Sequence, residues 1–177
     1  GFADGIAYYN EAKGTSVKLL GWDKAAQDGS FTGDFEDQNK GKQITDNFIQ
    51  QGADIILPVA GPVGLGAAAA AKASGGKANL IWVDTDGFVS VPDYKDLFIT
   101  SIVKGLDVSV EQATKDAVDG NFSNEAFVGT LENDGVGLAP YHDFDSKVPD
   151  ELKAEVDQLK ADIISGKVTV TSPASPK

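Results

Sequence analysis

The chain has 177 residues, 41% of them hydrophobic and 24% charged, a balance typical of one globular domain and not of a disordered chain. With 15 basic against 27 acidic side chains the formal net charge is −12, and a surface that acidic repels nucleic acid and anionic membranes. There is no cysteine, which excludes disulfides and thiolate chemistry, and His142 is the only histidine through which Ser-His catalysis could run.

The first residues predict a helix that is already under way. Phe2, Ile6 and Tyr9 fall at positions i, i+4 and i+7, which places them on one face of a helix. The chain has no methionine, even at position 1, and no signal peptide or long apolar run precedes this helix. We therefore expect the chain to be a processed or truncated piece of a longer protein.

The first half of the chain alternates predicted strands with predicted helices. Strands are predicted over residues 17–21, 54–60 and 79–83, and helices over residues 38–51 and 65–73. The second of these strands is a nearly continuous apolar run, which is typical of a strand buried on both faces of a parallel sheet. The short connections predict an α/β fold, an open parallel sheet with helices on both faces.

The second half of the chain is less regular. Its predicted elements are a strand over residues 98–103, a helix over 107–118 with Asp107 as N-cap, a hairpin formed by 126–131 and 135–138, and a helix over 149–165. The last helix has the strongest signals, because Pro149 stands at its start, acidic residues follow in its first turn and Gly166 ends it. Residues 171–177 are expected to be a disordered tail.

A glycine-rich segment, Gly61-Pro62-Val63-Gly64-Leu65-Gly66, follows the apolar strand and opens a helix. Backbone N–H groups at such a helix start can bind an anion or a polar ligand group. The spacing fits neither common nucleotide motif, because a P-loop needs Lys and Ser or Thr where this chain has two alanines, and G-x-G-x-x-G is absent. A ligand contact and a plain tight turn are equally compatible with the segment.

Charged side chains stand where two predicted strands end. Asp84 and Asp86 follow the strand at 79–83 and Lys104 follows the strand at 98–103, at the edge where open α/β sheets bind ligands. Two carboxylates there could act as acid and base, bind calcium, or accept hydrogen bonds from sugar hydroxyls. We favour the hydroxyl interpretation because a calcium loop needs further ligands that the chain does not supply. A solvated pair of loop side chains is the alternative.

Ser101 and Lys104 also match the S-x-x-K pattern of serine acyl-enzymes. In those enzymes the motif stands at a helix start and is joined by S-D-N and K-T-G. Here it lies within a predicted strand, and neither companion motif occurs. The strand context and the missing companion motifs therefore argue against acyl-enzyme chemistry.

Several aromatic side chains fall in predicted loops. Trp22, Phe31 and Phe35 share one Gly- and Asp-rich stretch, and Phe88 lies in another loop. Aromatic residues at such positions either fill a local core or form a stacking platform for a flat ligand, and the residues alone favour neither. His142 is predicted to be a surface or hinge residue.

Five segments carry a family resemblance. They are residues 1–5 (GFADG), 29–41 (GSFTGDFEDQNKG), 51–61 (QGADIILPVAG), 83–86 (VDTD) and 100–104 (TSIVK), of which the third is the most specific. In this order they resemble the basic membrane protein family, the PnrA-like substrate-binding lipoproteins of ABC importers. The match runs to about residue 170 and implies the second lobe of a type I periplasmic-binding-protein fold.

The resemblance implies which residues bind a ligand. In family members that bind purine nucleosides, the base is stacked between two aromatic rings, one from each lobe, and the ring of the second lobe corresponds to Phe35. The polar groups that hold the base and the ribose correspond to Gly61, Asp84 and Lys104, with Asp86 as a neighbouring candidate for the carboxylate contact. The resemblance implies no catalytic residue, no metal and no cofactor.

The resemblance also implies a division of the chain. Residues 1–104 and 125–170 would form the second, C-terminal lobe, and residues 105–124 a crossover helix that packs on a first lobe. That lobe and the lipoprotein signal are not part of this sequence. The intact protein would be lipid-anchored at the cell surface or in the periplasm. Its expected partners are a nucleoside, preferably a purine, and the permease subunits of the importer, with no role for nucleic acid.

Other functions fit the same residues. The fold could bind a sugar, a flavin or a signalling molecule instead, because similar folds serve many ligands. Asp84 and Asp86 could process nucleosides as acid and base, and a transcriptional regulator could share the fold. An aromatic platform at Phe35 favours a flat base over an aliphatic ligand, which makes nucleoside binding the primary hypothesis.

Overall fold

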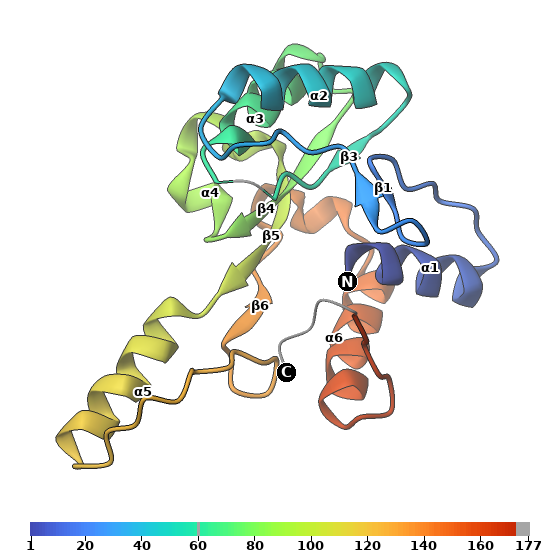
Figure 1. The fold of residues 1–177 in the computed structure, drawn as a ribbon. Helices are drawn as coiled ribbons and strands as arrows, with labels where there is room; N and C mark the ends of the chain where they lie inside the picture. Colours follow the sequence, from blue (N-terminus) through green and yellow to red (C-terminus); the bar gives the residue numbers. More distant parts are fainter. Residues whose placement is uncertain (60, 173–177) are drawn as a thin grey trace.

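The computed structural model describes residues 1–59 and 61–172, so most of the predicted tail at 171–177 lies outside the described residues (Figure 1). The α-helices are α1 (Phe2–Lys13), α2 (Gln38–Gln50), α3 (Val63–Ala73), α4 (Gly87–Ser90), α5 (Leu106–Val118) and α6 (Asp150–Ile164). The strands are β1 (Trp22–Asp23), β2 (Asp28–Gly29), β3 (Ile55–Ile56), β4 (Asn79–Asp84), β5 (Phe98–Lys104) and β6 (Val136–Leu138). The 3-10 helices are η1 (Pro92–Leu97) and η2 (His142–Lys147).

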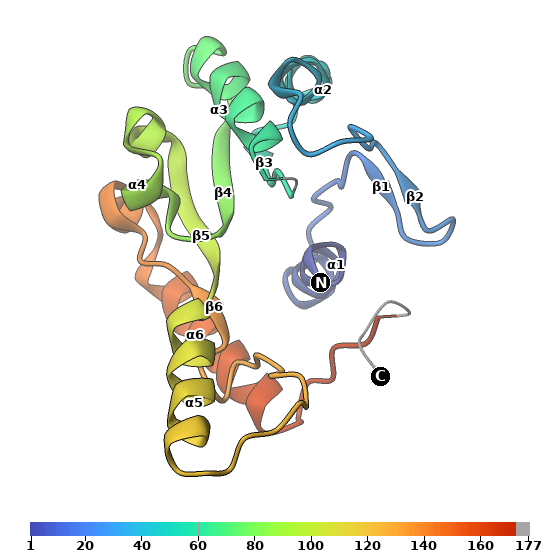
Figure 2. The same cartoon turned by 60° about the vertical axis from the view of Figure 1, so that its left-hand side comes forward.

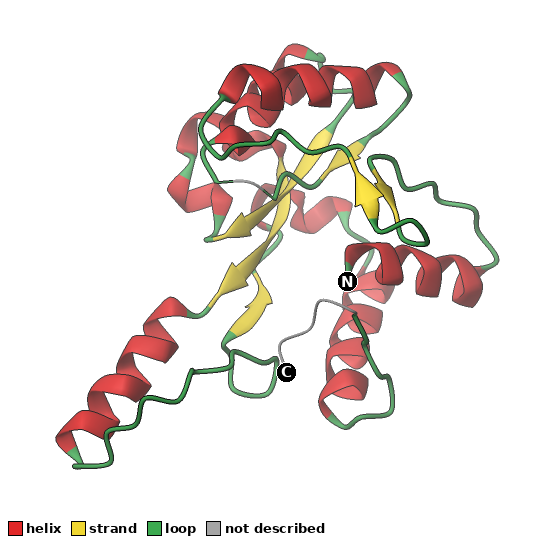
Figure 3. Ribbon diagram, in the orientation of Figure 1, coloured by secondary structure: helices red, strands yellow, loops and turns green. Residues whose placement is uncertain are grey.

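The main sheet has the strand order β3-β4-β5-β6 (Figure 3). β4 pairs in parallel with both β3 and β5, whereas β6 runs antiparallel to β5. β1 and β2 form a separate antiparallel hairpin. The predicted α/β class with a parallel sheet is confirmed, except that the last strand is antiparallel. Within the part of the chain that the structure describes, no helix is long and apolar enough to span a membrane.

The buried core lies between the sheet and α3. It contains Ile56, Ala68, Ala71, Ala78, Leu80, Trp82 and Phe98. Side chains alternate across a strand, and in β4 Leu80 and Trp82 face this core while Ile81 and Val83 on the other face are only half-buried. The helical cover is therefore uneven, with α2 and α3 stacked together at one end of the sheet (Figure 2).

Glycines allow α2 and α3 to approach each other closely. A Cβ atom added at Gly66 of α3 would overlap the carbonyl oxygen of Gln38, and one added at Gly41 of α2 would overlap the carbonyl oxygen of Val63. Both glycines have ordinary helical backbone angles, so lack of space and not conformational freedom requires them. The close packing holds the first turns of both helices beside each other.

We predict that Gly66→Ala lowers the free energy of unfolding by about 1–3 kcal/mol, because the new methyl group forces the two helices apart. Gly5→Ala in α1 is the matched control, since nothing lies within 4 Å of the added carbon. Alanine favours a helix by about 0.5–1 kcal/mol over glycine, so the control stabilises α1 slightly or changes nothing. Urea unfolding followed by circular dichroism measures both, and an unchanged Gly66→Ala protein would contradict the packing.

The strand predicted over residues 17–21 is wrong. The segment is irregular because the side-chain amide of Asn10 takes both backbone groups of Val17. Asn10 Nδ2 donates to the carbonyl oxygen of Val17 at 2.9 Å, and Val17 N donates to Asn10 Oδ1 at 2.8 Å. Local bonds of this kind compete with strand pairing. The first paired strand along the chain is β1.

The hairpin predicted over residues 126–138 is also wrong. Only its second half forms a strand, β6, and that strand pairs with β5. The first half is irregular because Asn133 takes its backbone groups: Asn133 Oδ1 accepts from Thr130 N at 2.7 Å, and Asn133 Nδ2 donates to the carbonyl oxygen of Val128 at 3.0 Å. Asn133 lies in a turn over residues 131–134, and Val136 N donates to the carbonyl oxygen of Thr130 at 3.3 Å, but residues 126–131 form no strand beside β6.

Several predicted boundaries shift. The strand expected over 54–60 is regular only at β3, where Pro58, which has no N–H to donate, soon follows. Residue 60 lies outside the described residues. Gly105, and not Asp107, is the N-cap of α5, although Asp107 still lies in the first turn, where a negative charge is favourable. The predicted helices over 38–51, 65–73 and 149–165 are confirmed to within two residues at each end.

α5 projects away from the sheet (Figures 1 and 2). None of its residues is buried, and Leu106, Val110 and Val118 expose 58%, 64% and 81% of their surface. The accessible surface of the chain is 11715 Å², against about 8,200 Å² for a compact protein of its mass. The structure therefore leaves apolar faces open to contact with further protein.

Candidate functional site

Asp84 and Lys104 meet at the carboxyl edge of the parallel sheet. Asp84 is the last residue of β4 and pairs in register with Val103, so Lys104, the last residue of β5, stands beside it. Lys104 Nζ lies 2.7 Å from Asp84 Oδ1, and the two side chains are 61% and 49% exposed. The sequence placed both residues at one edge, and the structure joins them in an ion pair that solvent can reach.

The backbone of Asp84 is unusual. Its φ angle is +69°, in the left-handed region that non-glycine residues seldom adopt, although aspartate does so more often than most. Thr85 N donates to the carbonyl oxygen of Val83 at 2.8 Å, which closes a tight turn around Asp84. The turn ends β4 abruptly and presents the carboxylate at the edge of the sheet.

Phe35 and Gly61 come together although 26 positions separate them in the sequence. Val63 N donates to the carbonyl oxygen of Phe35 at 3.2 Å, and a Cβ added at Gly61 would lie 4.0 Å from Phe35 Cβ. Gly61 has a φ of +48°, so the turn there favours glycine. The Phe35 ring is not a core residue, because 69% of its surface is exposed. It is available for stacking on a flat ligand.

A groove of about 570 Å³ runs past the ends of β3 and β4. Its lining residues are Gln38, Gly61, Pro62, Leu65, Trp82, Thr85, Ser90, Val91, Pro92, Asp93 and Tyr94. Gly61 therefore shares a groove with Thr85, the residue after Asp84. Of the candidate residues only Gly61 lines this groove, whereas Phe35, Asp84, Asp86 and Lys104 lie outside its lining.

Asp86 is used differently from Asp84. Its Oδ1 accepts a hydrogen bond from Phe88 N at 3.1 Å and so caps α4, and its Oδ2 lies 2.7 Å from His142 Nε2. The Asp86 side chain is only 24% exposed. The structure therefore gives the two aspartates different partners, and it leaves Asp84, which the sequence analysis preferred, as the more accessible candidate.

His142 is not the plain surface residue that the sequence suggested. Its side chain is 23% exposed, and its ring stacks on Phe88 with centroids 4.1 Å apart and an angle of 10° between the ring planes. The pairing with Asp86 spans 56 positions, so no local pattern points to it. The sequence holds only two signals of this pairing. They are an aspartate followed by Gly-Phe at a helix start, and a single histidine far along the chain.

Asp34 organises the turn that carries Phe35. Its Oδ1 accepts from the backbone N–H groups of Asp37 at 2.7 Å and Glu36 at 3.0 Å, and its Oδ2 accepts from Lys40 Nζ at 2.9 Å. These donors stabilise the carboxylate and lower the pKa of Asp34 from 3.8 to about 2, with the Asp37 N–H contributing most. The turn that presents Phe35 is therefore held by a charged group.

We predict that Lys40→Gln raises the pKa of Asp34 above 2 but leaves it below 3.8, because the backbone donors remain. Lys42→Gln, which breaks the neighbouring pair with Asp46, is the control and leaves the pKa of Asp34 unchanged. Since the folded pKa lies below the ordinary value, the carboxylate stabilises the turn above about pH 4. That contribution is lost as the pH falls toward 2. Titration of the side-chain carboxyl carbons by NMR measures these values. If the pKa of Asp34 in Lys40→Gln stayed at about 2, the role of the ammonium group would be contradicted.

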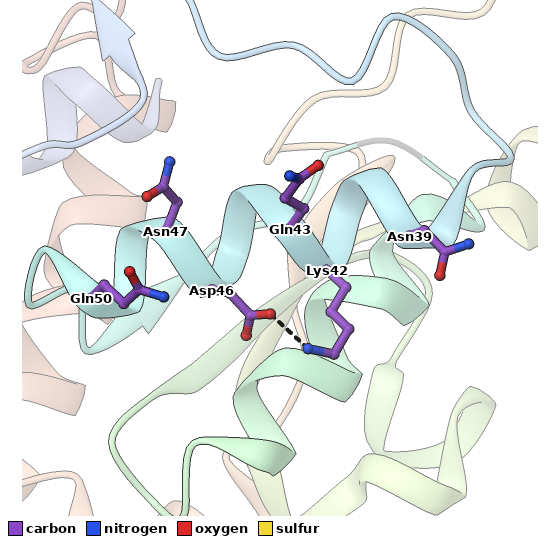
Figure 4. Close-up of a pocket in the computed structure, with 6 residues that line it drawn as sticks. All are labelled: Asn39, Lys42, Gln43, Asp46, Asn47 and Gln50. Atoms are coloured by element: carbon purple, nitrogen blue, oxygen red, sulfur yellow. Dashed lines mark hydrogen bonds and ion pairs between the residues drawn. The ribbon is translucent and has the colours of Figure 1, made fainter.

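A second surface hollow runs along α2 (Figure 4). The residues that line it are Asn39, Lys42, Gln43, Asp46, Asn47 and Gln50. All six come from one helix and their side chains spread outward from it, with Lys42 paired to Asp46 at 2.6 Å. A single helix supplies no opposing wall, so we interpret this hollow as a solvated helix face.

The chemistry of the described residues fits binding and not catalysis. Ser101 is fully buried and its hydroxyl accepts a hydrogen bond from Gly87 N at 3.0 Å, so it is not placed as a nucleophile. Among residues 1–59 and 61–172, no three His, Cys, Asp or Glu side chains gather in a group that could hold a metal ion. The candidate residues that reach solvent offer an aromatic ring, at Phe35, and a carboxylate and an ammonium, at Asp84 and Lys104.

The fold is that of an ABC transporter solute-binding protein. The crystal structure of such a protein from Aeropyrum pernix K1 superposes with a TM-score of 0.79 and 26% identity over 97% of this chain and 52% of that one. A transcriptional activator of the comK gene from Bacillus halodurans superposes with a TM-score of 0.68 over 80% of this chain and 47% of that one. Its 17% identity shows likeness of fold alone.

Sequence relatives agree with this class. The chain is 33% identical over 155 residues to the "ABC transporter nucleoside-binding protein BmpA" of Lactococcus lactis and 32% identical over 155 residues to the "CD4+ T-cell-stimulating antigen" of Listeria monocytogenes. These matches cover 80% and 81% of this chain and 43% of each relative. An uncharacterized lipoprotein of Pyrococcus abyssi is 31% identical over 90% of this chain and 37% of its own length. The chain spans less than half the length of these relatives.

The family described as "ABC transporter substrate-binding protein PnrA-like" matches residues 1–173. The chain belongs to this family, as its sequence motifs predicted. Because the family consists of substrate-binding proteins, the chain is not an enzyme, and the acid–base interpretation of Asp84 and Asp86 no longer applies.

Proposed function

We propose that the chain contributes half of a nucleoside-binding site, with a preference for purines, in an ABC importer. The observation that carries this proposal is an exposed phenylalanine, Phe35, whose carbonyl oxygen binds the segment after β3, while an exposed carboxylate–ammonium pair stands at the ends of the parallel strands β4 and β5. A flat base needs a stacking surface and a ribose needs hydrogen-bonding groups. The name of the Lactococcus lactis relative supports the same ligand class.

Each group has a defined role in this proposal. Phe35 stacks on the base, and glycine at position 61 keeps the space beside the backbone and Cβ of Phe35 free of a side chain. The Asp84 carboxylate accepts hydrogen bonds from ribose hydroxyls, and Lys104 donates to an oxygen of the ligand. An exposed ion pair contributes about 1 kcal/mol or less to stability, so a ligand can replace one of its partners at small cost.

We further propose that a first lobe, encoded outside these 177 residues, closes over this edge. Residues 105–124 form the crossover helix and its end, and the exposed Leu106, Val110 and Val118 of α5 pack on that lobe. Residues 1–104 and 125–170 make up the second lobe. The intact protein is anchored by lipid at the cell surface or in the periplasm, and its closed form delivers the ligand to the permease subunits. The lipoprotein name of the Pyrococcus abyssi relative supports this location.

Calorimetric titration of the full-length protein with adenosine, guanosine, inosine, cytidine and uridine tests the ligand class. We expect tight binding of at least one purine nucleoside, and no comparable binding of ribose or riboflavin. The 177-residue chain alone is expected to bind at least ten-fold more weakly, since one of the two walls is missing. Binding of riboflavin or a sugar in place of every nucleoside would overturn the proposed ligand.

Phe35→Ala tests the stacking role in the same titration. Loss of base stacking costs about 1–3 kcal/mol, which is a roughly 5- to 150-fold rise in Kd. Phe31→Ala is the matched control, because Phe31 lies in the same loop and is equally exposed but packs edge-on against Trp22. If Phe31→Ala weakened binding more than Phe35→Ala, the assignment of the stacking ring would be wrong.

Asp84→Asn tests the ribose contact. We expect the substitution to raise the Kd of a ribonucleoside about ten-fold and to leave the Kd of its 2′,3′-dideoxy analogue almost unchanged, because the analogue has no hydroxyls to donate. Asp150→Asn, whose side chain is 98% exposed at the start of α6, is the control for the change in charge. An equal loss for both nucleosides would show that Asp84 does not bind the ribose hydroxyls.

A further inference from the structure

The segment that follows β4 is strained at one end and clamped in its middle. Left-handed backbone at non-glycine residues occurs, within the described residues, at Gln27, Asp84, Asp134 and His142. Two of these, Asp84 and His142, belong to one connected cluster around α4. Such conformations persist only where the surrounding structure holds them, and they gather at functional sites.

The clamp is made by Asp86 and His142. One oxygen of Asp86 caps α4 through Phe88 N, and the other lies 2.7 Å from His142 Nε2. The His142 ring also stacks on Phe88, whose ring centre lies 5.6 Å from Lys95 Nζ. One imidazole therefore holds both the cap and the first turn of α4, and both members of the pair are about three-quarters buried.

β5 anchors both sides of this clamp. The buried Ser101 accepts a hydrogen bond from Gly87 N through its hydroxyl at 3.0 Å, and from Ala139 N through its carbonyl at 2.9 Å. Thr100 Oγ1 donates to the carbonyl oxygen of Ala139 at 2.7 Å. Ser101 therefore binds both the segment that follows Asp84 and the segment that leads to His142, and Thr100 adds a second bond to the latter.

We propose that Asp86 and His142 are positioning residues that hold the Asp84 carboxylate in place for ligand binding. Asp84 lies two residues before Asp86, the N-cap of α4. When Asp86 is free to move, the left-handed backbone of Asp84 relaxes. The carboxylate then leaves the position in which it pairs with Lys104. The ligand part of this inference rests on the proposed function, whereas the geometric part concerns the ligand-free protein.

Hydrogen exchange and amide shifts in the ligand-free chain test the geometric part. His142→Asn removes the ring contacts, and asparagine tolerates the left-handed backbone, so the variant adds little strain of its own. We expect exchange at the Gly87 and Phe88 amides to accelerate at least ten-fold and the Asp84 amide resonance to shift. His142→Gln, whose amide can still donate to Asp86, is expected to restore part of the protection.

Lys13→Ala is the control, because it breaks an exposed pair with Glu155 that joins α1 to α6 far from this cluster in the sequence. It leaves exchange at Gly87 and Phe88 unchanged. Asp86→Asn keeps an oxygen for the cap but weakens the pair with His142, and it provides a second variant if His142→Asn fails to fold. Unchanged exchange and unchanged Asp84 shifts in both variants would overturn the inference.

Ligand titration of the full-length protein tests the functional part. With whichever of the five nucleosides binds the unsubstituted protein most tightly, we expect His142→Asn to raise Kd about ten-fold, His142→Gln to raise it less, and Lys13→Ala to leave it unchanged. Faster exchange without a change in Kd would reduce the pair to a structural contact and overturn the positioning role. If no nucleoside binds the unsubstituted protein, the proposed function fails, and the exchange experiment alone decides whether the clamp exists.

Discussion

The parallel pairing of β4 with β5 decides where the candidate site lies. Because both strands run in one direction, Asp84 and Lys104 end at the same edge, and the register sets them side by side. β5 also anchors the segments around α4 and η2, since Ser101 binds Gly87 and both Thr100 and Ser101 bind Ala139. A slip of one residue between the two strands would turn the charged ends to opposite faces. The pairing of Asp84 with Lys104 therefore depends on this register.

The hydrophobic pattern predicted the elements that pack against the core, and it failed where side chains take over backbone hydrogen bonds. The helix over residues 38–51 was predicted within two residues because its apolar positions are periodic, and the strand over 79–83 because residues 80–83 form a continuous apolar run. The strand over 17–21 and the first half of the hairpin look extended by the same criterion. Asn10 and Asn133 occupy their backbone groups instead, and an apolar pattern does not show which partner a backbone amide will find.

For the site, the sequence could predict which residues lie at the binding edge of the sheet, but not which residues contact one another there. The rule that ligands bind where parallel strands end was enough to select Asp84, Asp86 and Lys104 as candidates. It could not separate the two aspartates, because their difference arises from His142, which is distant in sequence. The contact of Phe35 with Gly61 likewise arises from the packing of the chain before α2 against the chain before α3. Such tertiary contacts leave almost no local trace in composition or spacing.

The two aspartates illustrate how a binding site can combine a rigid backbone with a contact that a ligand can replace. Asp86 gives both oxygens to protein groups, so it fixes the backbone but has little capacity left for a ligand. Asp84 pairs with one exposed lysine on a long flexible stem, and about half of its own surface is open. Replacing that lysine by a ligand group costs little, because exposed ion pairs are weak. A backbone fixed by Asp86, together with the weak and solvent-accessible contact of Asp84 with Lys104, allows a site both to select a ligand and to release it. The proposed delivery to a permease requires both.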